Sequence, residues 1–108
     1  MPQFIYTLQP TRLGMLSDGP SAEEQAAVMA HVSHLEAEAA NGRVLLACRA
    51  QTNHEKTFGI VILQADSEQE AEQLMRADPA VAQGVMTAEL YPYRVAVLSD
   101  DIKQALQD

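Results

Sequence analysis

The chain has 108 residues, 47% of them hydrophobic and 20% charged, so we expect one domain with a modest core. Acidic residues outnumber basic ones by 15 to 7, which argues against nucleic acid as a partner, because proteins bind phosphate backbones with basic patches. No apolar run approaches the roughly 18 residues of a membrane span, and no signal peptide is visible. The single cysteine, Cys48, excludes an internal disulfide, so we expect a cytoplasmic protein without membrane association.

The first half of the chain predicts a strand, a long connection and a helix. Residues 3–9 alternate as a strand does. Residues 10–20 form a connection of a length that is often functional or mobile in small domains. Ser21 and Glu24 match the capping box that begins a helix, and Asn41-Gly42 matches a helix end. The apolar stripe of this helix consists of Val28, Val32, Leu35 and Ala39.

The second half predicts a hairpin, a second helix and a last strand. Residues 43–49 and 57–65 read as two strands, and residues 67–78 as a helix with another capping box. Residues 84–98 are extended and contain a proline, which indicates an edge, a bulge or a bend. A short C-terminal helix is predicted from Asp100.

This order of elements, β-α-β-β-α-β, predicts an α+β, ferredoxin-like fold: a four-stranded antiparallel sheet with two helices on one face. We expect one domain over residues 1–108, with a core of about 3–98 and a C-terminal helix or tail at 99–108. Residues 60–63 are apolar on both strand faces, so the face without helices also needs a cover. A second copy of the chain is the simplest cover, which predicts a homodimer. The alternative is that the C-terminal segment folds back over its own sheet.

Asp78 stands out because it shares a helical face with three apolar residues, Ala71, Leu74 and Met75. A carboxylate on that face points toward the core or a pocket, and an unpaired buried carboxylate is very costly. His31 lies roughly 60° from the stripe of the first helix and His34 roughly 120°. The two helices of this fold pack side by side, so His31 and Asp78 can meet.

A His–Asp pair of this kind suits acid–base chemistry, because the carboxylate fixes the imidazole tautomer and raises its basicity. In the alternative interpretation Asp78, placed before Pro79, only ends the helix, and His31 only makes a local hydrogen bond.

Arg12 and His34 are candidates for substrate binding. The Arg12 guanidinium can clamp a substrate carboxylate with two hydrogen bonds. Its alternative is a surface arginine paired with Asp18 or Glu89. We expect His34 to be a second histidine of the site. The alternative is that His34 is a solvated surface residue.

The sequence gives little support for a metal site, for a reactive cysteine or for other catalytic bases. His31 and His34 at i, i+3 can share a metal, but no third ligand has a recognisable spacing and His54 lies in a polar connection, so we expect no metal and no cofactor. Cys48 alternates within an apolar strand and is interpreted as inert core. If Met1 is removed, the Pro2 amine is a rival candidate for a base.

Six segments spread over the chain form a recognisable set: His31-Val32-Ser33-His34-Leu35, Asn41-Gly42-Arg43-Val44, Phe58-Gly59-Ile60-Val61, Asp78-Pro79-Ala80-Val81, Gly84-Val85-Met86 and Tyr91-Pro92-Tyr93. The most specific part is a DP-x-V-x-x-G block with an earlier H-x-x-x-L. Together these segments resemble the YCII (YciI-like) family over about Phe4 to Leu98.

The resemblance implies a dimeric α+β barrel with an active site around His31 and Asp78, and a kinship with muconolactone-isomerase-like enzymes. The long connection at 10–20 and His34, where an aromatic is common, depart from the family pattern. Our leading hypothesis is a small-molecule enzyme that uses the His31–Asp78 pair for isomerase- or lyase-type proton transfer. The alternative is a non-catalytic dimeric module that binds a metabolite or assists a larger enzyme.

Overall fold

The computed structural model describes residues 1–52 and 55–107, so the predicted loop position of His54 lies outside the described residues. The chain order of the elements is β1 (Gln3–Pro10), α1 (Gly14–Ser17), α2 (Ala22–Ala40), β2 (Val44–Arg49), β3 (Gly59–Gln64), α3 (Glu68–Ala77), α4 (Pro79–Ala82), β4 (Met86–Tyr93) and α5 (Asp100–Gln107).

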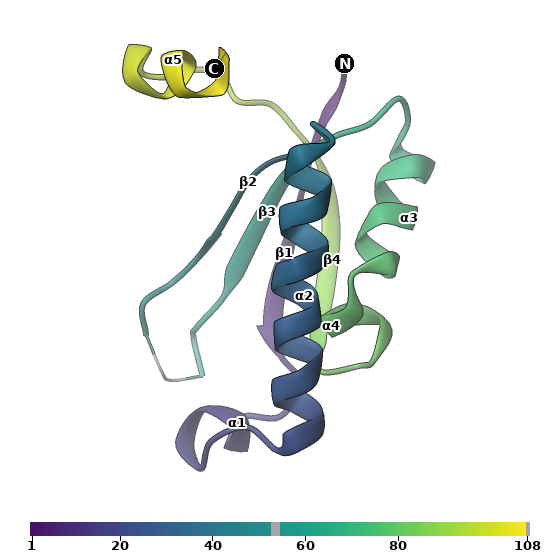
Figure 1. Ribbon diagram of the computed structural model, residues 1–108, viewed down its shortest axis with the longest axis vertical. Helices are drawn as coiled ribbons and strands as arrows, with labels where there is room; N and C mark the ends of the chain where they lie inside the picture. Colours follow the sequence, from purple (N-terminus) through teal and green to yellow (C-terminus); the bar gives the residue numbers. More distant parts are fainter. Residues whose placement is uncertain (53–54, 108) are drawn as a thin grey trace.

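The four strands form one antiparallel sheet in the order β2-β3-β1-β4. Helices α2, α3 and α4 lie on one face of this sheet, with α2 in the centre and α3 and α4 to one side of it (Figure 1). The predicted α+β, ferredoxin-like fold is therefore confirmed. Pro92 lies in β4, an edge strand, where its missing N–H leaves no ladder bond unmade.

Local capping explains where the two long helices begin. The Ser21 hydroxyl accepts a hydrogen bond from the Glu24 N–H at 3.2 Å, and the Glu24 carboxylate accepts one from the Ser21 N–H at 2.8 Å. Ser67 caps α3 through one of the two capping-box bonds: its hydroxyl accepts from the Glu70 N–H at 3.1 Å. The Glu70 carboxylate accepts from the Asp66 N–H at 3.3 Å rather than from that of Ser67, so the predicted second capping box is only half formed. After α2 the chain turns at Gly42, whose φ of +81° is a conformation that glycine adopts without strain.

Two short helices were not predicted, and the last two strands are shorter than predicted. Helix α1 occupies part of the connection at 10–20, and α4 follows Pro79 directly. A proline at the first position of a helix is favourable because its missing N–H has no partner there in any case. The predicted helix does end before Pro79, and the same proline begins α4. The last strand ends at Tyr93 rather than near Leu98.

The core lies between the sheet and the helices. It consists of the strand residues that face the helices and the helix residues that face the sheet, namely Phe4, Tyr6, Leu8, Leu35, Val44, Val61, Leu63, Ala65, Ala71 and Met75. The interpretation of Cys48 as core is wrong. Strand β2 is an edge strand, and Cys48 is exposed there opposite Ile60.

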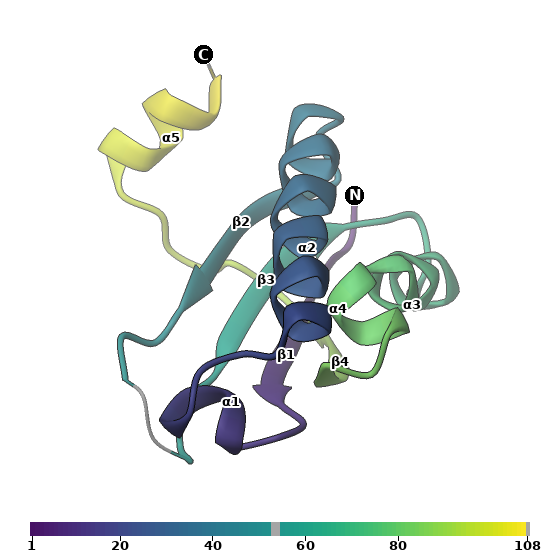
Figure 2. The same ribbon diagram turned by 60° about the horizontal axis from the view of Figure 1, so that its bottom comes forward.

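The C-terminal segment lies on the side of the sheet away from the helices. After β4 the chain crosses behind the sheet to the β2 side, where it forms α5 (Figures 1 and 2). The Val95 N–H donates to the Gln3 side-chain oxygen at 2.7 Å, which ties this segment to β1. This segment runs along the face that the C-terminal alternative assigns to it, and both that cover and the homodimer stay predictions. In the described part of the chain, no helix combines the length and the apolarity that a membrane crossing requires.

Leu63 tests the core directly, because it lies in β3 and is fully buried. Leu63→Ala should lower the free energy of unfolding by about 2–5 kcal/mol, since it removes buried methyl groups and leaves a cavity. Val97→Ala is the control, because Val97 is exposed; we expect a change within about 0.5 kcal/mol for it. Urea unfolding measures both, and equal effects would contradict this description of the core.

Candidate active site

Asp78 is completely buried and accepts hydrogen bonds from three different elements. The His31 Nδ1 atom, from α2, lies 2.7 Å from Asp78 Oδ1 and 2.8 Å from Oδ2. The Tyr6 hydroxyl of β1 donates to Oδ2 at 2.9 Å, and the Ala80 N–H of α4 donates to Oδ1 at 3.0 Å. The structure therefore brings together His31 and Asp78, and adds Tyr6, which we did not predict.

The local sequence places the carboxylate at this point. Asp78 ends α3 and also caps α4, with an extended backbone between the two helices. Pro79 favours this conformation, because the residue before a proline is disfavoured in the helical region. Helix α2 lies against α4 (Figure 2), and its residue His31 contacts the carboxylate at the junction of α3 and α4. The alternative reading of Asp78 as a helix-end residue is thus also true, since one carboxylate performs both tasks.

The hydrogen bonds determine the charge on Asp78. Burial by itself raises the pKa of Asp78, but the hydrogen bond and charge of His31, with the bonds from Tyr6 and Ala80, outweigh it and hold the pKa below the ordinary 3.8. Burial, and then the charge of Asp78 and the bond to it, raise the pKa of the Tyr6 hydroxyl far above its ordinary value. Tyr6 is therefore a permanent donor to an ionised carboxylate.

The charge on Asp78 also fixes the tautomer of His31. An ionised carboxylate only accepts hydrogen bonds, so the Nδ1 atom of His31 carries the proton. In the neutral ring the other nitrogen, Nε2, is then an acceptor. Nε2 makes no hydrogen bond to any residue within the described ranges 1–52 and 55–107.

His31 is also part of the wall of a cavity of about 790 Å³. The cavity lies between α2, the β2–β3 hairpin and the connection that contains α1, and the predicted apolar stripe of α2 lines it. Its volume is that of a typical small-molecule site. The side chains that line it from the helices and from the sheet include Met15, Leu16, Val28, Val32, Leu35, Ala39, Leu8, Val44, Ala47, Arg49, Val61 and Met86.

These positions define the free edge of the imidazole. The His31 side chain is 12% exposed, and its Nδ1 edge is turned to Asp78. The Nε2 edge is therefore the one that a ligand in the cavity can reach. The arrangement presents a proton acceptor, backed by a buried negative charge, to a mostly apolar space.

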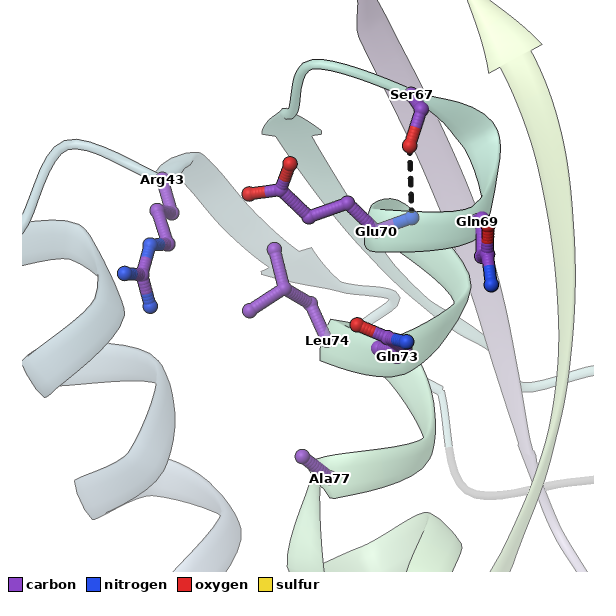
Figure 3. Close-up of a pocket in the computed structure, with 7 residues that line it drawn as sticks. All are labelled: Arg43, Ser67, Gln69, Glu70, Gln73, Leu74 and Ala77. Atoms are coloured by element: carbon purple, nitrogen blue, oxygen red, sulfur yellow. Dashed lines mark hydrogen bonds between the residues drawn. The ribbon is translucent and has the colours of Figure 1, made fainter.

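A second cavity, of about 640 Å³, lies between Arg43 and the first turns of α3 (Figure 3). Its lining consists of Arg43, Ser67, Gln69, Glu70, Gln73, Leu74 and Ala77. Neither His31 nor Asp78 contributes to it, and the Ser67 hydroxyl that it contains is used to cap α3. The cavity beside His31 is therefore the better candidate.

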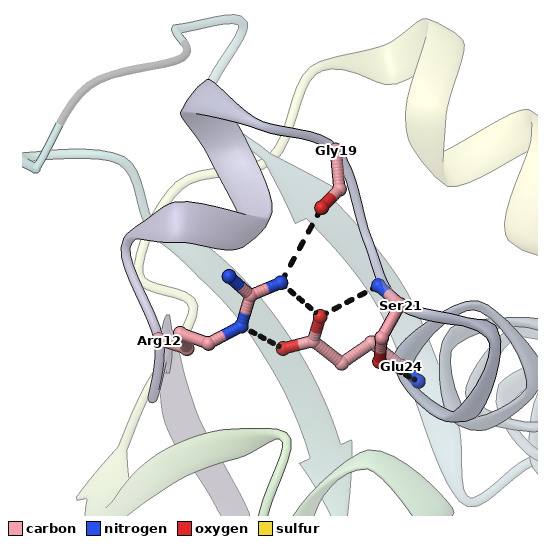
Figure 4. A network of polar contacts seen from close by, with 4 residues as sticks. All are labelled: Arg12, Gly19, Ser21 and Glu24. Atoms are coloured by element: carbon pink, nitrogen blue, oxygen red, sulfur yellow. Dashed lines mark hydrogen bonds and ion pairs between the residues drawn. The ribbon is translucent and has the colours of Figure 1, made fainter.

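Arg12 does not line the cavity, and its guanidinium is bound by the Glu24 carboxylate (Figure 4). Its Nε donates to one oxygen of Glu24 at 3.0 Å, and its Nη2 donates to the other at 2.5 Å and to the Gly19 carbonyl at 3.3 Å. The alternative prediction that Arg12 pairs with Asp18 or Glu89 is wrong, because its ion-pair partner is Glu24. The substrate-binding role of Arg12 stays a prediction, and the contacts give it another task, which is to fasten the connection at 10–20 to the start of α2.

The hydrogen bond from Arg12, together with that from the Ser21 N–H, lowers the pKa of Glu24 to about 2. Glu24 is therefore a permanent anion that serves both the capping box and the connection. Gly19 lies in that connection and lines the cavity, so this contact also shapes the site.

His34 is half-buried one turn beyond His31 and does not line the cavity. It makes no hydrogen bond within the described part of the chain, and its predicted substrate-binding role stays a prediction. Among those same described residues, no three His, Cys, Asp or Glu side chains gather as metal ligands would.

Tyr6 could have been found from the sequence. Strand alternation places it with Phe4 and Leu8 on one face of β1. A tyrosine on the core face needs a partner for its hydroxyl, and a buried Asp78 carboxylate can accept further hydrogen bonds besides the one expected from His31.

The fold and the site define an α+β protein with a buried His–Asp pair beside a cavity. The model of the YCII-related domain matches residues 7–94, so the chain belongs to the YCII-related family. None of the curated proteins matches the sequence significantly.

A solved structure with the same fold is that of 5-chloro-2-hydroxyhydroquinone dehydrochlorinase (TftG) from Burkholderia phenoliruptrix AC1100, in complex with 2,5-dihydroxybenzoquinone. The two chains share 18% sequence identity with a TM-score of 0.59, over 84% of this chain and 93% of the other. At this identity the likeness establishes the fold.

The hydrogen bond from Tyr6 should be visible in the titration of Asp78. We expect a higher Asp78 pKa in Tyr6→Phe than in the wild type, because the ionised carboxylate loses one donor. Since the pKa is lower in the folded chain than in the unfolded one, ionised Asp78 stabilises the fold above about pH 3.8, and this contribution is lost as the pH falls through the folded-state pKa. Tyr6→Phe should therefore lose stability at a higher pH.

Carboxyl ¹³C NMR and unfolding as a function of pH measure the two effects. Tyr91→Phe is the matched control, because the Tyr91 hydroxyl donates to Glu89 instead. An unchanged Asp78 titration in Tyr6→Phe, or the same shift in both variants, would contradict the assigned contact.

The Arg12–Glu24 contact should hold α1 in place. Glu24→Gln removes the charge that binds the guanidinium, so the amides of Met15, Leu16 and Asp18, which are hydrogen-bonded within α1, should exchange severalfold faster with deuterium. Glu23→Gln, which changes the neighbouring exposed carboxylate, should leave their exchange unchanged. Equal exchange in the two variants would show that the ion pair does not fasten this segment.

Proposed function

We propose that this protein is an enzyme that acts on a small organic molecule, with His31 as general acid and base and Asp78 as the residue that orients it. The observation that carries this proposal is the 2.7 Å contact between Asp78 and His31 Nδ1, made by a histidine that also lines a cavity. A buried, fully hydrogen-bonded carboxylate beside a partly exposed imidazole is typical of a site for proton transfer.

The proposed step begins with neutral His31. Nε2 accepts a proton from a C–H or O–H group of the substrate, and the electron pair of the broken bond stays on the substrate. The imidazolium that forms is stabilised by the negative charge of Asp78, whose position Tyr6 and Ala80 keep fixed. His31 then returns the proton either to another substrate atom or to the departing group.

The first outcome is an isomerisation and the second an elimination, and neither needs a nucleophile from the protein. An elimination places the electron pair of the broken C–H bond in a new double bond while the leaving group departs with its own pair. The structural neighbour from Burkholderia phenoliruptrix is named as a dehydrochlorinase, which is an elimination of this kind. That neighbour supports the reaction class as a proposal for this chain.

We further propose a cytoplasmic homodimer. Part of the sheet face opposite the helices stays accessible beyond the C-terminal segment, and Tyr91 and Tyr93 are nearly half exposed. A second copy of the same face is the simplest cover for it, as in the dimeric α+β barrel that the family resemblance implies.

The proposed role of His31 is tested with a panel of cyclic and chlorinated organic acids as substrates. If the wild type turns one over, His31→Ala should lower kcat/KM by about 10²–10⁴-fold, which is the usual contribution of a general acid or base. Ser33→Ala is the control, since it alters an exposed residue of the same helix; it should retain the wild-type rate.

Full activity of His31→Ala would contradict the mechanism. Binding by the wild type without turnover of any bound compound would instead favour the alternative function, a metabolite-binding or accessory module, which the mostly apolar cavity also suits.

A further inference from the structure

The arginines of the chain differ in whether they form an ion pair, and this difference bears on the cavity beside His31. Three arginines of the chain are bound to glutamates: Arg12 to Glu24, Arg43 to Glu38 and Arg76 to Glu72. Two others, Arg49 and Arg94, make no ion pair with any residue in the described ranges. Of these two, only Arg49 lines the cavity.

The strand register directs Arg49 toward the cavity. Arg49 is the last residue of β2 and pairs with Gly59 of β3, two positions before the core residue Val61. Side chains two positions apart lie on one face of a sheet, so Arg49 lies on the face that α2 covers. Its cross-strand neighbour Gly59 has no side chain, and a Cβ added there would lie 3.3 Å from the Cys48 carbonyl oxygen and 3.8 Å from Leu8, another cavity residue. Arg49 is exposed and, because its partner is a glycine, has no side chain directly opposite it at this end of the hairpin.

The rest of the cavity wall is mostly apolar. Val28 and Leu35 contribute from α2, and Val44 and Val61 from the hairpin. Among the charged groups that line it, Glu36 of α2 is the single carboxylate within the described part of the chain. In a protein with a net charge of −8, an unpaired arginine beside an apolar cavity is the feature that would attract an anion. The guanidinium fork matches the two oxygens of a carboxylate.

We propose that Arg49 binds the carboxylate of a small monocarboxylic acid, whose apolar ring or chain occupies the space between α2 and the β2–β3 hairpin. The carboxylate lies at the end of β2, and the body of the ligand extends toward Nε2 of His31. Glu36 disfavours a second negative charge on the ligand, which restricts the class to monoanions. This inference rests on the proposed function for the role of His31, but the binding of the carboxylate does not depend on catalysis.

The experiment compares benzoate with benzamide, a neutral molecule of the same shape, by calorimetry or ligand-observed NMR. The wild type should bind benzoate about tenfold more tightly than benzamide, which is the usual effect of one charge-assisted pair. Arg49→Gln should abolish this preference while still binding benzamide, and Arg49→Lys should keep part of it. Arg94→Gln is the matched control, because it removes the other unpaired arginine, and it should keep the full preference.

The outcomes separate this inference from the proposed function. His31→Asn should keep the preference for benzoate whatever it does to turnover, so a loss of turnover with intact preference supports both ideas. Intact turnover in His31→Asn with the preference lost in Arg49→Gln refutes only the catalytic role of His31. No binding of benzoate to the wild type at millimolar concentration, or an unchanged preference in a folded Arg49→Gln, overturns the assignment of Arg49.

Discussion

The carboxylate of Asp78 has to be hydrogen-bonded because it is completely buried, and this requirement organises the middle of the molecule. Its donors come from β1, α2 and α4, so one side chain joins the sheet to both parts of the helical layer. The same bonds engage Nδ1 of His31, while its Nε2 makes no hydrogen bond within the described part of the chain. A structural need of the fold and a chemical property of the site therefore have one origin.

The cavity follows from an uneven distribution of the helices over the sheet. Helices α3 and α4 pack on β1 and β4, and α2 alone lies against β2. The apolar stripe of α2 is therefore not fully matched by side chains of the hairpin, and Val32 remains nearly half exposed beside the cavity. The connection that contains α1 closes one end of this space. An apolar stripe that usually indicates core here lines a cavity.

Two arginines that look alike in the sequence have different environments. Arg12 lies near the N-terminus of α2, where the capping box has already oriented the Glu24 carboxylate, so a strong local pair forms. Arg49 lies at the end of an edge strand opposite a glycine, and no described carboxylate pairs with it. The charge of an arginine is available to a ligand only where the protein supplies no nearer anion.

The sequence by itself determined the order and caps of the main elements and the burial of Asp78. It also pointed to His31 as the partner. The order of the elements, their caps and the helical face of Asp78 depend on residues close together in the chain, which periodicity and capping report. The pairing with His31, 47 residues from Asp78, followed instead from the packing of the two helices in the predicted fold and from the family resemblance. The tertiary structure decided that Tyr6, 72 residues away from Asp78, donates to it, and that Arg12 binds Glu24 rather than facing the cavity. It also decided the second role of Pro79 and the path of the C-terminal segment. Such contacts depend on which elements pack against one another and on which residues along each element meet. A pattern within one element carries no information about this packing.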